Sequence, residues 1–359
     1  MKLVRHLAVR QTGEMASDRS GSIRNRLVAT EARLSPLASR EASSRGRAID
    51  EEPELLRLAY QIDRDRIIHT RAFRRLKHKT QVFIAPDSDH VVTRMTHTIE
   101  VQQVARTIAR ALALNEDLTE AVAMGHDLGH TPFGHAGEEE LAELLPEGFR
   151  HNEQSLRIVE QLEREGRGLN LTWETRDGIL KHSKVRESVA AEAWGAAETL
   201  EGQIVKLADS IAYLNHDIHD AIRSGLLAED ELPDRVRHHL GVTHSQRIDT
   251  LVTDCVAASG ATFETDSPAI VLGREALAAT DDLRAFMFER VYLHEETLRD
   301  AEIGHVVVRS LYQYYVKRTD EVTGWARPDD PPWRRAADYV SGMTDGFALA
   351  RARGLGLIE

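Results

Sequence analysis

The chain has 359 residues, of which 42% are hydrophobic and 29% are charged, and its formal net charge at pH 7 is −12. This composition is typical of a globular protein with a large core, and the negative charge argues against a surface that coats nucleic acid, although local basic patches stay open. No apolar run approaches the roughly 18–20 residues that span a bilayer, no secretory signal is visible, and the single cysteine, Cys255, favours a reducing cytoplasm without an internal disulfide.

Residues 1–50 are polar and carry few apolar anchors, which predicts an arm that is either mobile or ordered against a partner subunit. From about residue 54 the apolar period is helical nearly everywhere. We expect a mainly α, single large domain with a core at 51–225 and further C-terminal helices at 226–359. Short strand-like runs occur only at residues 79–84 and 268–272.

Three helical segments have clear apolar faces. In the segment 96–112, positions 97, 101, 104, 108 and 111 share one face. The segment 115–129 begins with Asn115 as an N-cap and is predicted to end at Gly129. The segment 198–225 is long, amphipathic and stopped by a glycine.

These faces carry polar residues inward and predict a metal site. His97, His126 and Asp209 each occupy an apolar face, and Asp127 adjoins His126 at a helix end. An isolated buried carboxylate costs several kcal/mol, so an inward aspartate needs a cation or a hydrogen-bond cage. Taken singly, each histidine is more typical of a satisfied core or surface residue than of a metal ligand. Two imidazoles and two carboxylates together favour one divalent metal, and this ligand set suits Mn, Fe, Co, Ni, Zn or Mg.

The residues after this helix have a different chemical character. His130, His135 and Glu138 follow in an irregular glycine-rich and proline-rich segment. His135 and Glu138 are three apart, so they are neighbours if a helix begins near residue 135. A carboxylate beside an imidazole is typical of a general acid or base, and it is also typical of a loop salt bridge.

Two further groups are candidates for ligand binding. Tyr213 and Asp217 follow Asp209 at i+4 and i+8, on a stripe suited to a sugar hydroxyl or to a solvated groove. The segment 64–79 carries seven Arg or Lys residues. Such a run is usually a solvated helix face, but beside a metal cleft it would also suit phosphates or single-stranded nucleic acid.

The order His97, His126-Asp127, Asp209 resembles the HD superfamily of metal-dependent phosphohydrolases. Longer strings from about residue 34 to the C-terminus resemble the bacterial deoxyguanosinetriphosphate triphosphohydrolase family, and these include "GHDLGHTPFGHAGE", "TRMTHTIEVQQVARTIARAL" and "DYVSGMTDGFAL". The resemblance implies an all-α HD-domain helical bundle. It also implies an enzyme, often oligomeric, that splits a dNTP into a deoxynucleoside and tripolyphosphate, in some cases with a second dNTP as activator.

The resemblance assigns roles to residues at matching positions. It implies four metal ligands, which are His97, His126, Asp127 and Asp209. It implies His135 with Glu138 as the catalytic pair. The residues that it implies for substrate binding are Gln81, Arg94, His130, His151, Tyr213 and Asp217, with the tyrosine ring crowding the place of a ribose 2′-hydroxyl.

Some positions receive no role or depart from the family pattern. Lys181 and His182 match the family, but geometry gives them no role. Val91 and Val92 stand where an aromatic residue and an arginine are expected.

The alternatives left open are another HD phosphohydrolase, acting on nucleoside monophosphates or on cyclic or alarmone nucleotides, and a non-catalytic nucleotide-binding or nucleic-acid-binding protein. The preferred dNTP and the metal are not readable from the sequence.

Overall fold

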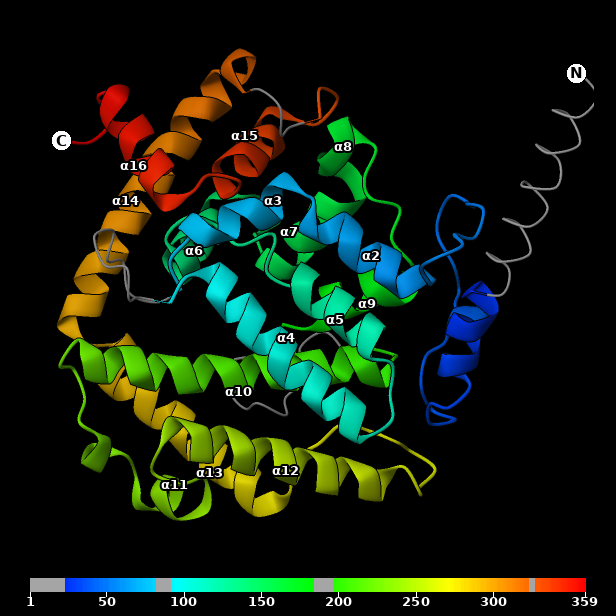
Figure 1. The fold of residues 1–359 in the computed structure, drawn as a ribbon. Helices are drawn as coiled ribbons and strands as arrows, with labels where there is room; N and C mark the ends of the chain where they lie inside the picture. Colours follow the sequence, from blue (N-terminus) through cyan, green and yellow to red (C-terminus); the bar gives the residue numbers. More distant parts are fainter. Residues whose placement is uncertain (1–22, 82–91, 184–195, 323–326) are drawn as a thin grey trace, which may run out of the picture.

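The computed structural model describes residues 23–81, 92–183, 196–322 and 327–359, and these ranges form an all-α protein, as predicted (Figure 1). None of the described residues belongs to a strand, and two isolated bridges join Arg47 to Thr172 and Thr80 to Thr93. The expected strand at 268–272 is therefore irregular chain. Of the expected strand at 79–84, residues 82–84 lie outside the described residues, as does Val91.

The helices fall into two groups along the chain. The first group comprises α2 (Ala59–Ile68), α3 (Arg71–Arg75), α4 (Arg94–Ala111), α5 (Glu116–Gly125), α6 (Gly134–Leu144), α7 (His151–Arg157), α8 (Glu163–Gly166) and α9 (Trp173–Lys181). The second comprises α10 (Leu200–Arg223), α11 (Asp234–His239), α12 (His244–Thr262), α13 (Arg274–Met287), α14 (Glu295–Lys317), α15 (Pro332–Ser341) and α16 (Asp345–Gly354). Short 3-10 turns are η1 (Glu41–Ser43), η2 (Leu76–His78), η4 (Glu229–Glu231) and η6 (Thr319–Glu321), and π-helical turns are η3 (Ile158–Leu162) and η5 (Phe288–Tyr292).

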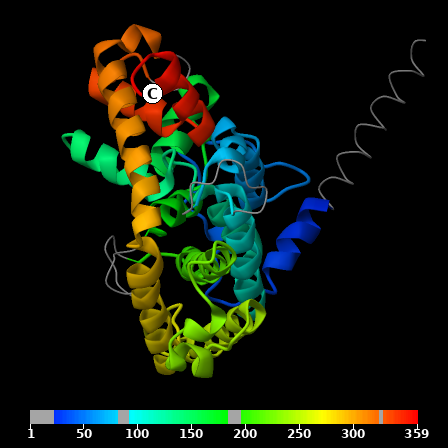
Figure 2. The same ribbon diagram turned by 90° about the vertical axis from the view of Figure 1, so that its left-hand side faces the viewer.

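Helices α4, α5 and α10 pack together at the centre, and α12 and α13 cover one side of them. A second apolar core joins α6 to α14, α15 and α16. Helix α14 runs along one side of the molecule and links the two cores, as Figure 2 shows. Within the described residues, no helix is both long and apolar enough to cross a membrane.

Helix α4 follows its predicted face, with one difference. The residues at 97, 101, 104 and 108 are buried, but Ala111 is exposed and Leu112 is buried instead. The helix ends at Ala111, and Leu112, as the C-cap residue, turns into the core. A strict helical period fails there because the regular helix stops.

The prediction that the next helix ends at Gly129 is wrong, because α5 ends at Gly125 and residues 126–129 form turns. Gly129 serves close packing: an added Cβ would overlap the backbone of His151 and Ser155 on α7. The hydroxyl of Ser155 donates to the carbonyl of His126 at 2.6 Å and accepts from the N–H of Gly129 at 2.8 Å. Helix α7 therefore fixes the chain direction after α5.

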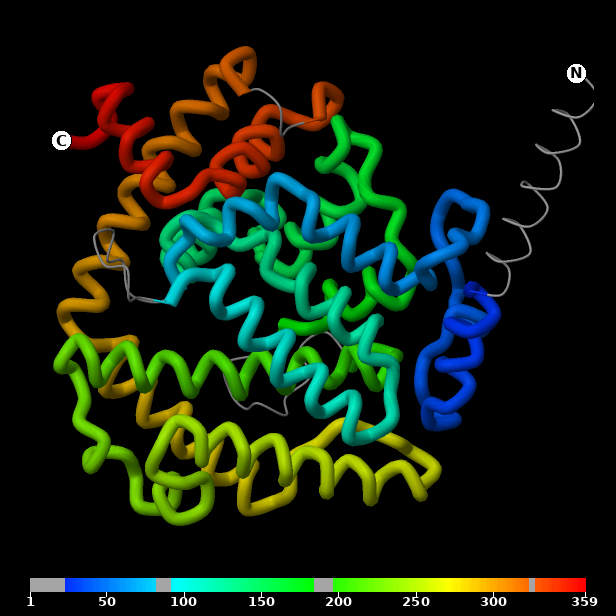
Figure 3. Tube along the Cα trace, in the orientation of Figure 1, coloured from blue at the N-terminus to red at the C-terminus, as the bar shows by residue number. Residues whose placement is uncertain are grey.

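Residues 23–50 lie against the same chain, beside the start of α2 (Figure 3). Residues 23–31 are helical. The N–H and hydroxyl of Ser39 donate to the Glu201 carboxylate on α10 at 3.0 and 2.9 Å. The side chain of Asn115, which caps α5, donates to the Ser39 carbonyl at 2.8 Å. Two central helices thus hold this segment in place.

Candidate metal centre and pocket

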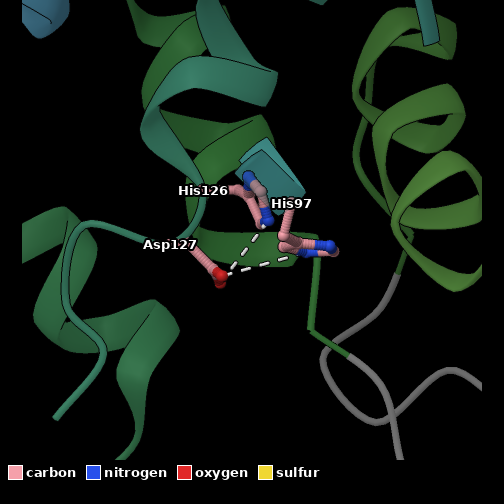
Figure 4. Close-up of side chains that lie close together, drawn as sticks. All are labelled: His97, His126 and Asp127. Atoms are coloured by element: carbon pink, nitrogen blue, oxygen red, sulfur yellow. Dashed lines mark ion pairs between the residues drawn. The ribbon is translucent and has the colours of Figure 1, made fainter. Parts of the chain in front are cut away.

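Three helices bring a histidine–aspartate cluster together. His97 lies in the first turn of α4, after the N-cap residue Thr93. His126 and Asp127 follow the end of α5, and Asp209 lies in the middle of α10. One donor atom from each of His97, His126 and Asp127 lies within 4.8 Å of the others (Figure 4). Nε2 of His97 also lies 3.1 Å from Oδ1 of Asp209, so the fourth predicted residue borders the cluster.

The protonation states of the two histidines in this cluster suit the binding of a cation. Nδ1 of His126 lies 2.7 Å from the Ala123 carbonyl, which can only accept, so Nδ1 carries a proton and the lone pair of the neutral ring would lie on Nε2. That Nε2 atom is buried and has no hydrogen-bond partner among the described residues. Burial lowers the pKa of His97 to about 4, which leaves its ring neutral at ordinary pH. Neutral imidazoles with a carboxylate are a suitable ligand set for a divalent transition metal.

Arg94 stands directly behind this cluster. Its NH1 donates to Oδ2 of Asp127 at 2.9 Å, and both side chains are almost fully buried. Burial opposes the charge on Asp127, but nearby His126, Arg94 and His97 hold the pKa of this carboxyl well below its usual range. The aspartate is therefore ionised and oriented. The guanidinium NH2 also donates to the Gln81 carbonyl at 3.4 Å, which ties the pocket wall to the cluster.

The carboxylate of Glu138, on α6, contacts two histidines. Nδ1 of His135 lies 3.3 Å from one of its oxygens, as the sequence spacing predicted. Nδ1 of His151 lies closer, at 2.8 Å from the other oxygen. Burial opposes the charge on Glu138, but His151 and His135 together hold the pKa of this carboxyl well below its usual range. The His135 side chain is 52% exposed and that of His151 is 12% exposed, so His135 is the more accessible of the two.

His182, for which sequence analysis predicted no role, lies next to His151. The Nε2 atoms of the two rings are 3.1 Å apart, and Nδ1 of His182 donates to the Ile179 carbonyl at 2.7 Å. Burial lowers the pKa of His182 to about 3, so its Nε2 is an acceptor. His151 thus donates from both ring nitrogens, to Glu138 and to His182. The neighbouring Lys181 forms an ion pair with Asp177 at 2.7 Å.

His130 stacks on His151, with ring centroids 4.1 Å apart and an interplanar angle of 18°. Burial, followed by the charge of Arg94, holds the pKa of His130 well below its usual range. Its Nδ1 is buried without a hydrogen-bond partner in the described part of the chain. The neutral His130 ring therefore has a polar atom without a hydrogen bond in the described part of the chain, and it stacks on the ring of His151, which is ion-paired with Glu138.

Tyr213 and Asp217 lie at different depths on α10. Tyr213 is half-buried and faces the pocket, whereas Asp217 is buried beneath Tyr292. The hydroxyl of Tyr292 donates to Oδ2 of Asp217 at 2.6 Å, and Nδ1 of His216 lies 3.0 Å from Oδ1. Nε2 of His216 in turn lies 3.0 Å from Nδ1 of His97. The inner aspartate is thus connected to the cluster through one histidine.

These groups surround one pocket of about 520 Å³. All of the predicted site residues line it except His126 and Asp217, which lie just behind its wall. The predicted lining residues are Gln81, Arg94, His97, Asp127, His130, His135, Glu138, His151, Asp209 and Tyr213. Oε1 of Gln81 is buried and has no hydrogen-bond partner among the described residues.

Sequence reasoning missed the opposite wall of the pocket. That wall includes Arg284, Phe288, Tyr292 and Leu298, from the C-terminal part of the chain. Arg284, Phe288 and Tyr292 are four apart and so share one helical face, which is a signal that was present in the sequence. Nothing in the local sequence linked that face to the histidines, because the two are more than 130 residues apart.

The basic segment 64–79 is largely engaged within the protein. Arg64 forms ion pairs with Asp65 and Glu120, and Arg66 forms one with Glu51. Lys79 is buried and donates to two backbone carbonyls. Arg71, Arg74 and Lys77 are exposed, so part of this basic run lies at the surface.

Comparison with known proteins gives consistent matches. Residues 94–214 match the HD domain, and residues 270–354 match the phosphohydrolase-associated domain. Three relatives are each called deoxyguanosinetriphosphate triphosphohydrolase-like protein. The one from Caldanaerobacter subterraneus subsp. tengcongensis is 52% identical over 89% of this chain and 91% of its own. Those from Desulfatibacillum aliphaticivorans and Bordetella pertussis are 46% and 40% identical, over 89% and 90% of this chain and 93% and 96% of their own.

Proposed function

This chain belongs to the deoxyguanosinetriphosphate triphosphohydrolase-like proteins of the HD family, and from that membership we propose that it hydrolyses deoxynucleoside triphosphates. The proposed products are the deoxynucleoside and intact tripolyphosphate. The observation that carries the proposal is one pocket in which a His–Asp cluster, a shared glutamate with two histidines and a half-buried tyrosine meet. The names of the relatives supply the nucleotide class.

The proposed holders of one divalent cation are His97, His126, Asp127 and Asp209. When bound, such a cation polarises a phosphate oxygen and lowers the pKa of water near it. The support from the described residues is the buried Nε2 of His126, which makes no hydrogen bond there and lies 3.5 Å from Oδ1 of Asp127, and the short distance between His97 and Asp209.

The bond to break joins the α-phosphorus to the 5′-oxygen of the sugar. Water adds its oxygen to phosphorus, and the departing 5′-oxygen needs a proton. We assign that proton to His135, because it is the exposed histidine at the pocket and Glu138 orients its ring. His130, His151 and Arg94 are proposed to face the phosphates. A His151 ring that donates from both nitrogens is cationic, which suits a polyanionic ligand.

The sugar is proposed to lie against Gln81 and Tyr213. Oε1 of Gln81, which makes no hydrogen bond to any described residue, suits a 3′-hydroxyl, and the Tyr213 ring is proposed to crowd the place of a 2′-hydroxyl, which would favour deoxynucleotides. Asp217 is proposed to act on the same region by holding the Tyr292 hydroxyl.

The test is to incubate the purified protein with each dNTP and each matching ribonucleotide, with Mn or Mg, and to identify the phosphate product by ³¹P NMR. Release of tripolyphosphate from dNTPs is expected. Release of pyrophosphate or of single phosphates would contradict the proposal and favour another HD phosphohydrolase activity. The His126→Ala variant is the control for a contaminating phosphatase.

A further inference from the structure

The turn between α15 and α16, residues 341–345, touches two distant segments of the pocket wall. Figures 1 and 2 show this turn beside α3. Arg75 at the end of α3 donates to the Gly342 carbonyl, and Nζ of the buried Lys79 donates both to the Ser341 carbonyl at 2.8 Å and to the His130 carbonyl. The turn does not itself line the pocket.

Asp345 makes the closest connection. One carboxylate oxygen accepts from the N–H and the hydroxyl of Thr80, at 2.9 and 2.7 Å. The other oxygen accepts from the N–H of Phe133 at 3.0 Å. Asp345 is only 7% exposed. A single buried side chain thus joins residues 79–81 to the loop 130–134.

The loop needs such a partner because its backbone is strained. Phe133 has a φ of +61° and Gly134 has a φ of +57°, so two successive residues are left-handed. For a residue with a side chain this conformation is unfavourable, because Cβ crowds the neighbouring carbonyl oxygen. The Phe133 side chain is buried against α14, where a Cβ added at Gly304 would lie 2.7 Å from Cβ and 3.2 Å from Cγ of Phe133. Phe133 is thus held by apolar packing of its side chain and by the hydrogen bond from its N–H to Asp345.

Both joined segments carry pocket residues. Gln81 follows Thr80 directly, and His130 and His135 lie on either side of the strained pair. Without the carboxylate, Thr80 and Phe133 lose the partner that they share, and the contact of Lys79 with the His130 carbonyl is left to join the two segments. The hydrogen bonds and ion pairs of the metal cluster on α4, α5 and α10 do not involve Asp345.

We propose that Asp345 is a positioning residue, whose carboxylate sets where Gln81, His130 and His135 stand in the pocket by joining their two backbone segments. The kinetic part of this proposal rests on the proposed function, whereas the local ordering of the two segments does not.

The variant Asp345→Asn tests it, because an amide has one acceptor oxygen and cannot serve both segments. We expect the amides of Thr80 and Phe133 to exchange hydrogen about tenfold faster than in the parent protein, with remote amides unchanged. We expect kcat/KM for dNTP to fall about 10- to 100-fold, as displaced catalytic groups do, with the bound metal per chain unchanged.

The matched control is Asp63→Asn. Asp63 is also buried, one of its oxygens accepts from the N–H and the hydroxyl of Thr172 at 2.9 and 2.6 Å, and neither residue lines the pocket. This variant should lose stability but keep kcat/KM per folded molecule and the slow exchange of Phe133.

Uniformly faster exchange in Asp345→Asn, with unchanged kcat/KM of the folded fraction, would overturn the proposal. If that variant does not fold, Thr80→Val removes one donor alone, and the same local pattern with a smaller loss of kcat/KM is expected; no local change would again overturn it. If the parent protein releases no tripolyphosphate, the proposed function fails, and the exchange pattern still decides the positioning role.

Discussion

Nδ1 of His151 lies 2.8 Å from Oε1 of Glu138, and the backbone N–H of His151 donates to the same oxygen at 2.8 Å. Burial alone would lower the pKa of His151, but Glu138 and then Asp127 raise it above the ordinary value. His151 therefore stays protonated to higher pH than an ordinary histidine and loses its proton as the pH rises through the raised pKa.

The Glu138→Gln substitution should lower the pH at which His151 loses its proton. We expect KM for dNTP to rise with increasing pH in both proteins, and to begin rising at lower pH in the variant. NMR titration of labelled histidine reports the His151 pKa directly. Glu143→Gln removes one charge from the exposed side of the same helix and should leave the midpoint unchanged. An unaltered midpoint in Glu138→Gln would refute the assignment.

Substitutions of His126 and of His135 should have different effects on metal binding and on turnover. His126→Ala removes the buried Nε2 and should lose the metal, measured by elemental analysis after dialysis. His135→Ala changes an exposed side chain outside the His97–His126–Asp127 cluster, so it should keep the metal and lose turnover by about 10²–10⁴-fold. Equal loss of metal in both variants would show that this division of roles is wrong.

Two Gly→Ala substitutions should have opposite effects on stability. At Gly129 the new Cβ overlaps backbone atoms of α7, and overpacking of this kind costs about 1–3 kcal/mol. At Gly260, inside α12, the nearest atom is 3.9 Å away, and the helical preference for alanine should stabilise the fold by about 0.5–1 kcal/mol. Urea unfolding of both variants measures this difference, and a stable Gly129→Ala would show that the contact between the 126–129 turn and α7 is looser than described.

Tyr292→Phe should weaken substrate binding. The change removes the donor to Oδ2 of Asp217, and a buried acceptor left without its partner costs about 1–3 kcal/mol. We expect KM for dNTP to rise roughly tenfold as the aspartate reorients. Tyr314→Phe is the control, because it also removes a hydroxyl that donates to a carboxylate, Glu321, in the other apolar core. Equal KM values for the two variants would exclude a role for the Tyr292–Asp217 pair.

The helical period was sufficient to place His97, His126 and Asp209 on inward faces, because a periodic pattern reports which side of a helix is buried. It did not locate the end of α5, since Gly129 is used for contact with α7 rather than for a helix stop. Nor did it reveal that Glu138 lies closer to His151 than to His135. That contact depends on how α6 and α7 meet, and no local spacing encodes the meeting of two helices.

The pocket also has a consequence for transplanting this activity. One of its walls comes from the HD match at 94–214, and the facing wall comes from the match at 270–354. A fragment with only the first matched range would contain the His–Asp cluster but would lack the facing wall of the pocket. A chimera of two relatives should therefore keep the shape of the pocket only when both matched ranges come from the same relative.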